Sequence, residues 1–194
     1  PTRADFNLFE DEGFAYNFGE GNLNVAEVKD SELDYVMVPF SVNGFRITTF
    51  CPAKKVSGSF TKLYLGSNVE SVGENTVYLS SNFSSLREIN VDPANKFLTA
   101  YKNVLYNIGN DAPYFIPSAI TKLELKPVKV IEKNFIYRLE NVEEIVFAEG
   151  TERIEAYAVE KCRNLRKVYV PSSVTYMDKE AIYDCGNDVE VIRK

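Results

Sequence analysis

The C-terminal half of the chain nearly repeats itself every 23 residues. The segment NVEEIVFAEGTERIEAYAVEKC (141–162) is followed by NLRKVYVPSSVTYMDKEAIYDC (164–185), and AITKLELKPVKVIEKNFIYRL (119–139) precedes both. A period of this length is typical of a solenoid, in which each unit buries its apolar edge only by stacking on its neighbours. The repeat therefore predicts a stacked core, and it constrains the fold more than any single motif does.

Two columns of aliphatic residues appear when the units are aligned on their short β segments. The first column contains Leu63, Ile89, Leu123, Ile145, Val168 and Val191, and the second contains Leu65, Val91, Leu125, Phe147 and Val170. Residues two apart share one face of a strand, so both columns should face the core. The rest of each unit reads as a turn, a short helical or 3₁₀ stretch and a return. The expected fold is therefore an α/β repeat with short parallel strands.

The residue before the first column alternates in charge. In chain order these positions are Lys62, Glu88, Lys122, Glu144, Lys167 and Glu190. Neighbouring strands of a ladder lie about 4.8 Å apart, so opposite charges could pair across it. Each exposed pair contributes only about 0–1 kcal/mol, so the alternation favours a role in setting the register.

The first fifty residues are organised differently. FAYNF (14–18) and LNV (23–25) flank GEGN, which is typical of a hairpin. We expect residues 1–50 to form an N-terminal β-hairpin cap and opening unit, and residues 51–194 to carry the repeats in one continuous domain. The 34-residue interval between Ile89 and Leu123 predicts an inserted hairpin near 95–117.

Two segments carry a family resemblance. LRKVYVPSSVTYMDKEAIYDC (165–185) and INVDPANKFLTAYKNVLYNIG (89–109) resemble the repeat and the inserted hairpin of the BspA-like (treponemal-type) leucine-rich repeat proteins. The chain departs from that pattern at Lys102-Asn103, where Asp-Gly is usual, and at Glu132, Glu155 and Asp178, where glycine is usual. The resemblance covers about residues 14–192. It implies a right-handed leucine-rich-repeat solenoid and a secreted or cell-surface protein of host-associated bacteria, linked to adhesion.

Composition narrows the function classes. The chain has a net charge of −6, which disfavours a nucleic-acid partner, and it has no run of apolar residues that could span a membrane. It also lacks histidine, which removes the usual general base and the commonest zinc ligand. We therefore expect no enzyme activity, no catalytic residue, no cofactor and no metal.

Two sets of residues could still suggest chemistry. Glu143/Glu144 and Glu152/Glu155 could be read as an acid and a base of a hydrolase, although pairing with the next repeat is the stronger interpretation. Cys162 and Cys185 lie one repeat apart, and a disulfide or a metal site is conceivable. Buried free thiols that act as small apolar side chains are the favoured interpretation.

An exposed column on the strands is the more promising ligand site. It comprises Tyr64, Asn90, Glu124, Val146, Tyr169 and Ile192. Tyrosine is favoured at interfaces, although tyrosine and valine are also simply good strand formers. The sequence thus predicts a non-enzymatic, extracellular or cell-surface adhesion module that binds a protein or glycan, such as host extracellular matrix, through its strand face. The alternative is a structural spacer from a longer surface array. Self-association at the C-terminal strand edge could cover VEVIRK (189–194).

Overall fold

The computed structural model describes residues 9–10, 13–19, 21–29, 34–51, 60–73 and 83–194. The chain divides into two compact units, of which the first is Pro1–Ile108 with Phe115–Pro117 and the second is Gly109–Tyr114 with Ser118–Lys194. The expected boundary at residue 50 falls within the first unit and stays a prediction. Some residues of the predicted cap, 1–8, 11–12, 20 and 30–33, lie outside the described residues.

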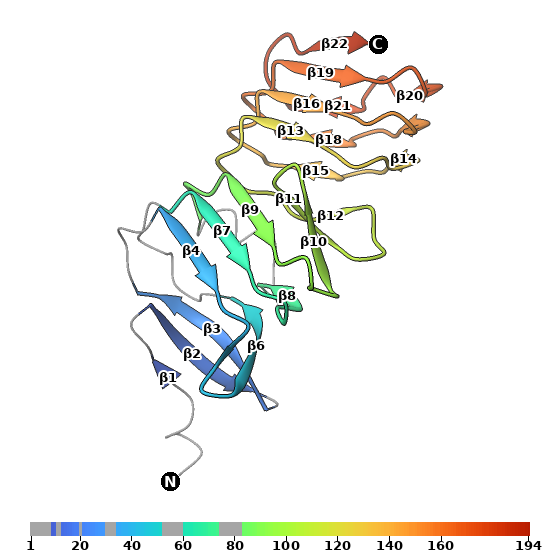
Figure 1. Cartoon of the computed structure of the whole chain (residues 1–194). Coiled ribbons are helices and arrows are strands. Elements are labelled where there is room, and N and C mark those ends of the chain that lie inside the picture. Colours follow the sequence, from blue (N-terminus) through green and yellow to red (C-terminus); the bar gives the residue numbers. More distant parts are fainter. Residues whose placement is uncertain (1–8, 11–12, 20, 30–33, 52–59, 74–82) are drawn as a thin grey trace. The chain divides into compact units, whose positions relative to one another are not determined.

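The second unit is a stack of repeats with three parallel ladders (Figure 1). The first ladder consists of β13 (Lys122–Glu124), β16 (Glu144–Val146), β19 (Lys167–Val170) and β22 (Glu190–Arg193). The second consists of β14 (Val130–Ile131), β17 (Arg153–Ile154) and β20 (Tyr176–Met177). The third consists of β15 (Ile136–Tyr137), β18 (Val159–Glu160) and β21 (Ile182–Tyr183).

The predicted aliphatic column forms the core of this unit except at Val191 on β22, which is 43% exposed. Leu123 lies in register with Ile145, and Ile145 with Val168, and all three side chains are fully buried. The second and third ladders add the buried side chains of Ile131, Ile154, Ile136 and Val159 to the same core. Burial of each such side chain stabilises the fold by about 1.5–3 kcal/mol. The stacking inferred from the 23-residue period is confirmed.

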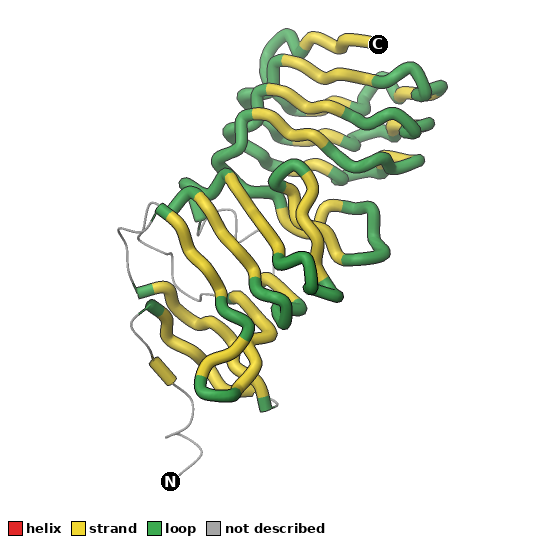
Figure 2. Tube along the Cα trace, in the orientation of Figure 1, coloured by secondary structure: helices red, strands yellow, loops and turns green. Residues whose placement is uncertain are grey.

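The α/β assignment is wrong, because the described residues contain no helix (Figure 2). The stretches expected to be helical or 3₁₀ are the two-residue strands of the second and third ladders and the turns between them. The apolar residues that follow each first-ladder strand, such as Ile154 and Val159 after Phe147, are spaced seven and then five apart, which resembles a helical period. In the structure that spacing arises because inward-facing residues sit on separate strands that meet at corners.

Several of these corners have left-handed backbone conformations. Arg138, Lys161 and Asp184, each 23 residues apart, have φ values of 57°, 60° and 49°. This conformation costs most residues about 1–2 kcal/mol and is best tolerated by glycine, asparagine and aspartate. The corner is thus a feature of the repeat that the side chains at 138 and 161 do not favour.

Besides strands of the insertion, the described part of the first unit contains one parallel ladder and one mixed sheet. The parallel ladder consists of β4 (Tyr35–Val38), β7 (Lys62–Leu65) and β9 (Glu88–Val91). The strands of the mixed sheet are β1 (Phe9–Glu10), β2 (Phe14–Gly19), β3 (Asn22–Val28), β5 (Ser41–Val42), β6 (Phe45–Phe50) and β8 (Ser71–Val72). Their order is β1-β2-β3-β6-β5, and β8 also pairs with β6. β2 and β3 pair in antiparallel fashion. That these strands act as a cap stays a prediction.

The insertion after β9 folds as β10 (Leu98–Tyr101), β11 (Val104–Asn107) and β12 (Pro113–Phe115), hydrogen-bonded in that order. β10 and β11 are antiparallel, and Lys102 and Asn103 connect them with φ values of 49° and 66°. Two positive φ values in a two-residue connection identify a type I′ turn. The departure from Asp-Gly therefore keeps the turn geometry.

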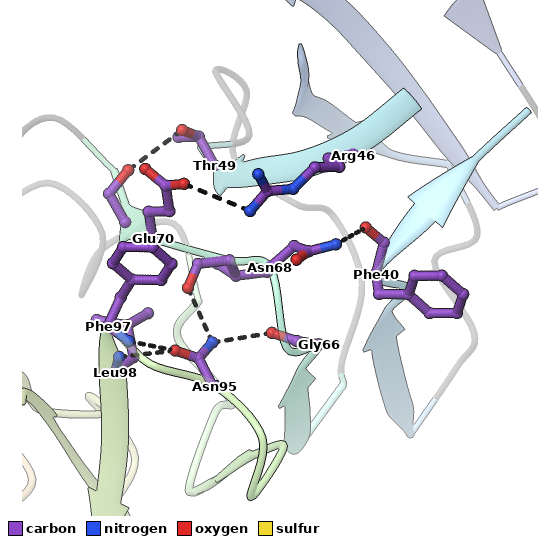
Figure 3. A network of polar contacts seen from close by, with 11 residues as sticks. Phe40, Arg46, Thr49, Gly66, Asn68, Glu70, Asn95, Phe97 and Leu98 are labelled. Atoms are coloured by element: carbon purple, nitrogen blue, oxygen red, sulfur yellow. Dashed lines mark hydrogen bonds and ion pairs between the residues drawn. The ribbon is translucent and has the colours of Figure 1, made fainter. Parts of the chain in front are cut away.

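A buried asparagine ties the start of the insertion to the preceding turn (Figure 3). The Asn95 Nδ2 group donates to the carbonyl oxygens of Gly66 and Val69, each 2.9 Å away. Its Oδ1 atom accepts from the backbone N–H groups of Phe97 and Leu98, each 2.8 Å away. Both ends of the amide are thus used within the first unit, as a buried polar group requires.

Candidate functional site

The outward face of the parallel strands holds the six predicted ligand-binding residues in two separate sets. In the first unit, Tyr64 on β7 lies in register with Asn90 on β9. In the second unit, Glu124, Val146, Tyr169 and Ile192 lie in register with one another on β13, β16, β19 and β22. The structure therefore brings together the members within each set.

Met37 extends the first set and was missed by the sequence reasoning. It lies on β4 in register with Tyr64, and its side chain is 54% exposed. The burial of β4 alternates strictly, with Val36 and Val38 inside. That alternation in YVMV was the signal that could have placed Met37 in the outward column.

Hydrogen bonds hold the polar members of this set in place. The Tyr64 hydroxyl donates to Asp92 Oδ2 at 3.2 Å, and Asn90 Nδ2 donates to Glu88 Oε1 at 2.8 Å. Burial of the ring, followed by the charge and hydrogen bond of Asp92, raises the pKa of Tyr64 above its ordinary value. The hydroxyl therefore remains a donor at neutral pH.

A shallow hollow adjoins Asn90 at the start of the insertion. Its volume is about 250 Å³, and it is lined by Asn90, Val91, Asp92, Pro93, Asn95, Leu98, Thr99, Ala100 and Ile108. Ile108 is 52% exposed at this rim. The hollow combines a carboxylate, an amide and a hydroxyl with an apolar wall, which is the mixture that small ligand sites use.

The second set has fewer available groups. The ammonium group of Lys122 lies 3.5 Å from the carboxylate of Glu124. The ammonium group of Lys194 lies 4.9 Å from the centre of the Tyr169 ring. Val146 and Ile192 are half-buried. Two of its four members are therefore apolar, and the other two already contact cations of the same unit.

The alternating charges occupy the register that the sequence predicted, but they pair only in part. Lys62 and Glu88 lie 3.8 Å apart. Within the described part of the chain, no ion pair joins Lys167 to Glu144 or to Glu190, although both are its register neighbours. Exposed pairs are weak in any case, so register remains the better explanation of the pattern.

The carboxylates considered for catalysis mostly face cations. The Glu143 carboxylate lies 4.0 Å from the Arg166 guanidinium group, and the Glu152 carboxylate lies 4.0 Å from Lys129 Nζ. Glu155 Oε1 lies 3.0 Å from Arg153 Nε. Glu144 stays on β16 without such a contact among the described residues. The structure thus places these acids in surface pairs across or within repeats.

The cysteines are free thiols, with Cys162 buried and Cys185 half-buried. The Cys162–Cys185 hydrogen bond and burial raise the pKa of Cys162, whereas the same bond lowers the pKa of Cys185 to about 7. No group of three or more potential metal ligands occurs among the described residues. In the same ranges, no helix has the length and apolar character needed to cross a membrane.

Comparison with known proteins identifies the repeat. A family model described as BspA type leucine rich repeat region matches residues 53–188 in six copies. No curated protein sequence matches the chain.

Several solved structures resemble the chain at low sequence identity. A leucine rich cell surface protein from Faecalibacterium prausnitzii is 13% identical over 96% of this chain and 50% of its own, with a TM-score of 0.45. A leucine-rich repeat protein from Bacteroides ovatus is 15% identical over 92% of this chain and 55% of its own, with a TM-score of 0.48. A leucine-rich repeat protein from T. pallidum is 11% identical over 95% of this chain and 84% of its own, with a TM-score of 0.42. The chain thus spans about half the length of the first two proteins, and the family assignment rests on the repeat model.

Proposed function

This chain belongs to the BspA-type leucine-rich repeat family, and from that premise we propose that it is a non-enzymatic binding module of the bacterial cell surface or exterior. It engages a protein or glycan through the outward face of its parallel strands. Repeat scaffolds of this kind serve binding because their stacked strands present a continuous surface rather than a closed reaction site.

The observation that carries the proposal is the meeting of the Met37–Tyr64–Asn90 column with the hollow beside the insertion. An exposed thioether and a hydrogen-bonded tyrosine give contact area, and the hollow adds an amide, a carboxylate and a hydroxyl close by. Interfaces gain most of their affinity from a few such anchors surrounded by weaker contacts. The first unit's strand face is therefore the principal binding surface, and the second set is a further contact surface on its own unit.

The test is binding of the purified chain to panels of extracellular-matrix proteins and glycans. The variants Tyr64→Ser and Asn90→Ala truncate two members of the first set, and Val146→Ser with Tyr169→Ser truncates two members of the second. Tyr176→Ser is the matched control, since Tyr176 is an exposed tyrosine on β20. Loss of binding of tenfold or more in the first pair, with the control unchanged, supports the proposal.

Two results would overturn it. Undiminished binding by folded Tyr64→Ser and Asn90→Ala variants would remove this face from consideration. Failure of the unmodified chain to bind any component of the panels would favour the spacer alternative. Circular dichroism of each variant separates a lost contact from a lost fold.

A further inference from the structure

A second hollow lies in the second unit, at the corners that follow β15 and β18. Its volume is about 520 Å³, and it is lined by Tyr137, Arg138, Glu140, Lys161, Arg163 and Asn164. These residues come from two successive repeats, and none belongs to the outward face of the first ladder. We call this hollow the corner groove.

Positive charge is concentrated in the corner groove, although the whole chain has a net charge of −6. Lys161 Nζ lies 2.8 Å from Glu160 Oε1 and donates to the Tyr137 hydroxyl at 3.1 Å. Within the described residues, the guanidinium groups of Arg138 and Arg163 have no carboxylate partner. By contrast, four other cations of this unit each lie within 4.0 Å of a glutamate: Lys122, Lys129, Arg153 and Arg166.

The arginine and lysine at the corner are not explained by backbone needs. Arg138 and Lys161 occupy the left-handed position at which the next repeat carries Asp184. Aspartate suits that conformation, whereas long cationic side chains gain nothing from it. Residues kept in a costly conformation are often kept for the group that their side chain presents.

The walls of the groove are polar and well fixed. Asn164 Nδ2 donates to the Glu140 carbonyl oxygen at 2.6 Å, and this bond fixes the amide at the groove. The Tyr137 ring is 37% exposed, and its centre lies 5.0 Å from Lys161 Nζ and 5.9 Å from Arg138 Cζ. The hollow thus combines three cations and the Glu140 side chain with a hydroxyl and an amide, and its lining is mostly polar.

We propose that the corner groove binds the carboxylate-bearing ring of an acidic saccharide. Arginine forks bind carboxylates in a two-pronged geometry, and the amide and phenol groups can bond to ring hydroxyls. The volume of the groove is that of a single small ligand, and the net negative charge of the chain disfavours extended polyanions. The site is separate from the strand face and does not depend on the function proposed for it.

Isothermal titration calorimetry with D-glucuronate and D-glucose tests this assignment, because the two sugars differ by the carboxylate. We expect the chain to bind glucuronate and to discriminate against glucose by about tenfold or more. The Arg138→Gln/Arg163→Gln variant should lose about tenfold in glucuronate affinity. Arg166→Gln should not, since it removes an exposed arginine that lies 4.0 Å from Glu143 on the first-ladder side.

Four outcomes would overturn the proposal. The first is equal binding of the two sugars, or no heat with either, and the second is unchanged affinity in a folded Arg138→Gln/Arg163→Gln variant. The third is an equal loss in Arg166→Gln, which would indicate a general charge effect. The fourth is tighter binding of a glutamate-rich peptide than of glucuronate, which would assign the groove to a protein partner. Retained glucuronate binding in Tyr64→Ser would keep this site distinct from the strand face.

Discussion

The Asn95 side-chain amide donates to the Gly66 carbonyl oxygen at 2.9 Å, and this contact joins the insertion to the turn that follows β7. Gly66 is itself tightly enclosed, because a Cβ atom there would lie 2.8 Å from the Val38 carbonyl oxygen. The chain segments at the ends of β4, β7 and β9 therefore meet at one polar junction. The strand face and its hollow depend on that junction for their position.

Replacement of Asn95 by alanine should lower the free energy of unfolding by about 2–4 kcal/mol, because it removes four hydrogen bonds to backbone groups at a buried position. Asn95 is only 6% exposed, so water cannot readily replace the amide. Urea unfolding measures the effect. Asn110→Ala is the control, since the exposed Asn110 makes a single bond to the Ala112 N–H group. Equal losses in both variants would contradict the argument.

A buried hydroxyl in the second unit should be dispensable. Thr151 is fully buried, and its Oγ1 atom has no hydrogen-bond partner. The residues one repeat before and after it are Val128 and Val174. Thr151→Val should therefore stabilise the chain by about 1 kcal/mol and raise the thermal midpoint by about 2–4 °C. Thr151→Ser, which keeps the hydroxyl and removes the methyl group, should lower the midpoint; a lower midpoint for Thr151→Val would show that the hydroxyl has a role.

The type I′ turn between β10 and β11 gives a third prediction. Asn103 has a φ value of 66°, which a β-branched residue adopts only at a cost. Asn103→Val should lower the free energy of unfolding by about 1–2 kcal/mol, whereas Asn103→Gly should leave it unchanged or slightly raised. Urea unfolding of both variants measures the difference. Similar values for valine and glycine would show that the turn relaxes to another type.

The sequence predicted the stacking of the repeats because that stacking is written in a strict period. Leu123, Ile145 and Val168 recur at 22 and 23 residues, and the charged residues before them lie in the same register. The helical stretches were predicted wrongly because short strands around a corner give a spacing of apolar residues that resembles a helix. The period alone does not distinguish the two.

The corner groove could not be predicted in the same way. It depends on where the side chains of Arg138, Lys161 and Arg163 project from left-handed corners, and no apolar pattern marks those positions. A weak signal was present in the 23-residue spacing of Arg138 and Lys161, each of which lies two residues after a core position. The hollow beside Asn90 likewise required the path of the insertion, which the sequence placed only approximately.

The pair Cys162 and Cys185 gives a pH-dependent prediction. The Cys162 thiol stays protonated and hydrogen-bonds to Cys185, which lowers the pKa of Cys185 to about 7. Because the thiolate is the nucleophile, alkylation of Cys185 by iodoacetamide should be slow below pH 7 and should approach a plateau above it. In a Cys51→Ala background, peptide mapping by mass spectrometry at a series of pH values measures the midpoint. Cys162→Ala removes the donor and should move the midpoint to higher pH, whereas an unchanged midpoint would show that Cys162 does not tune this thiol.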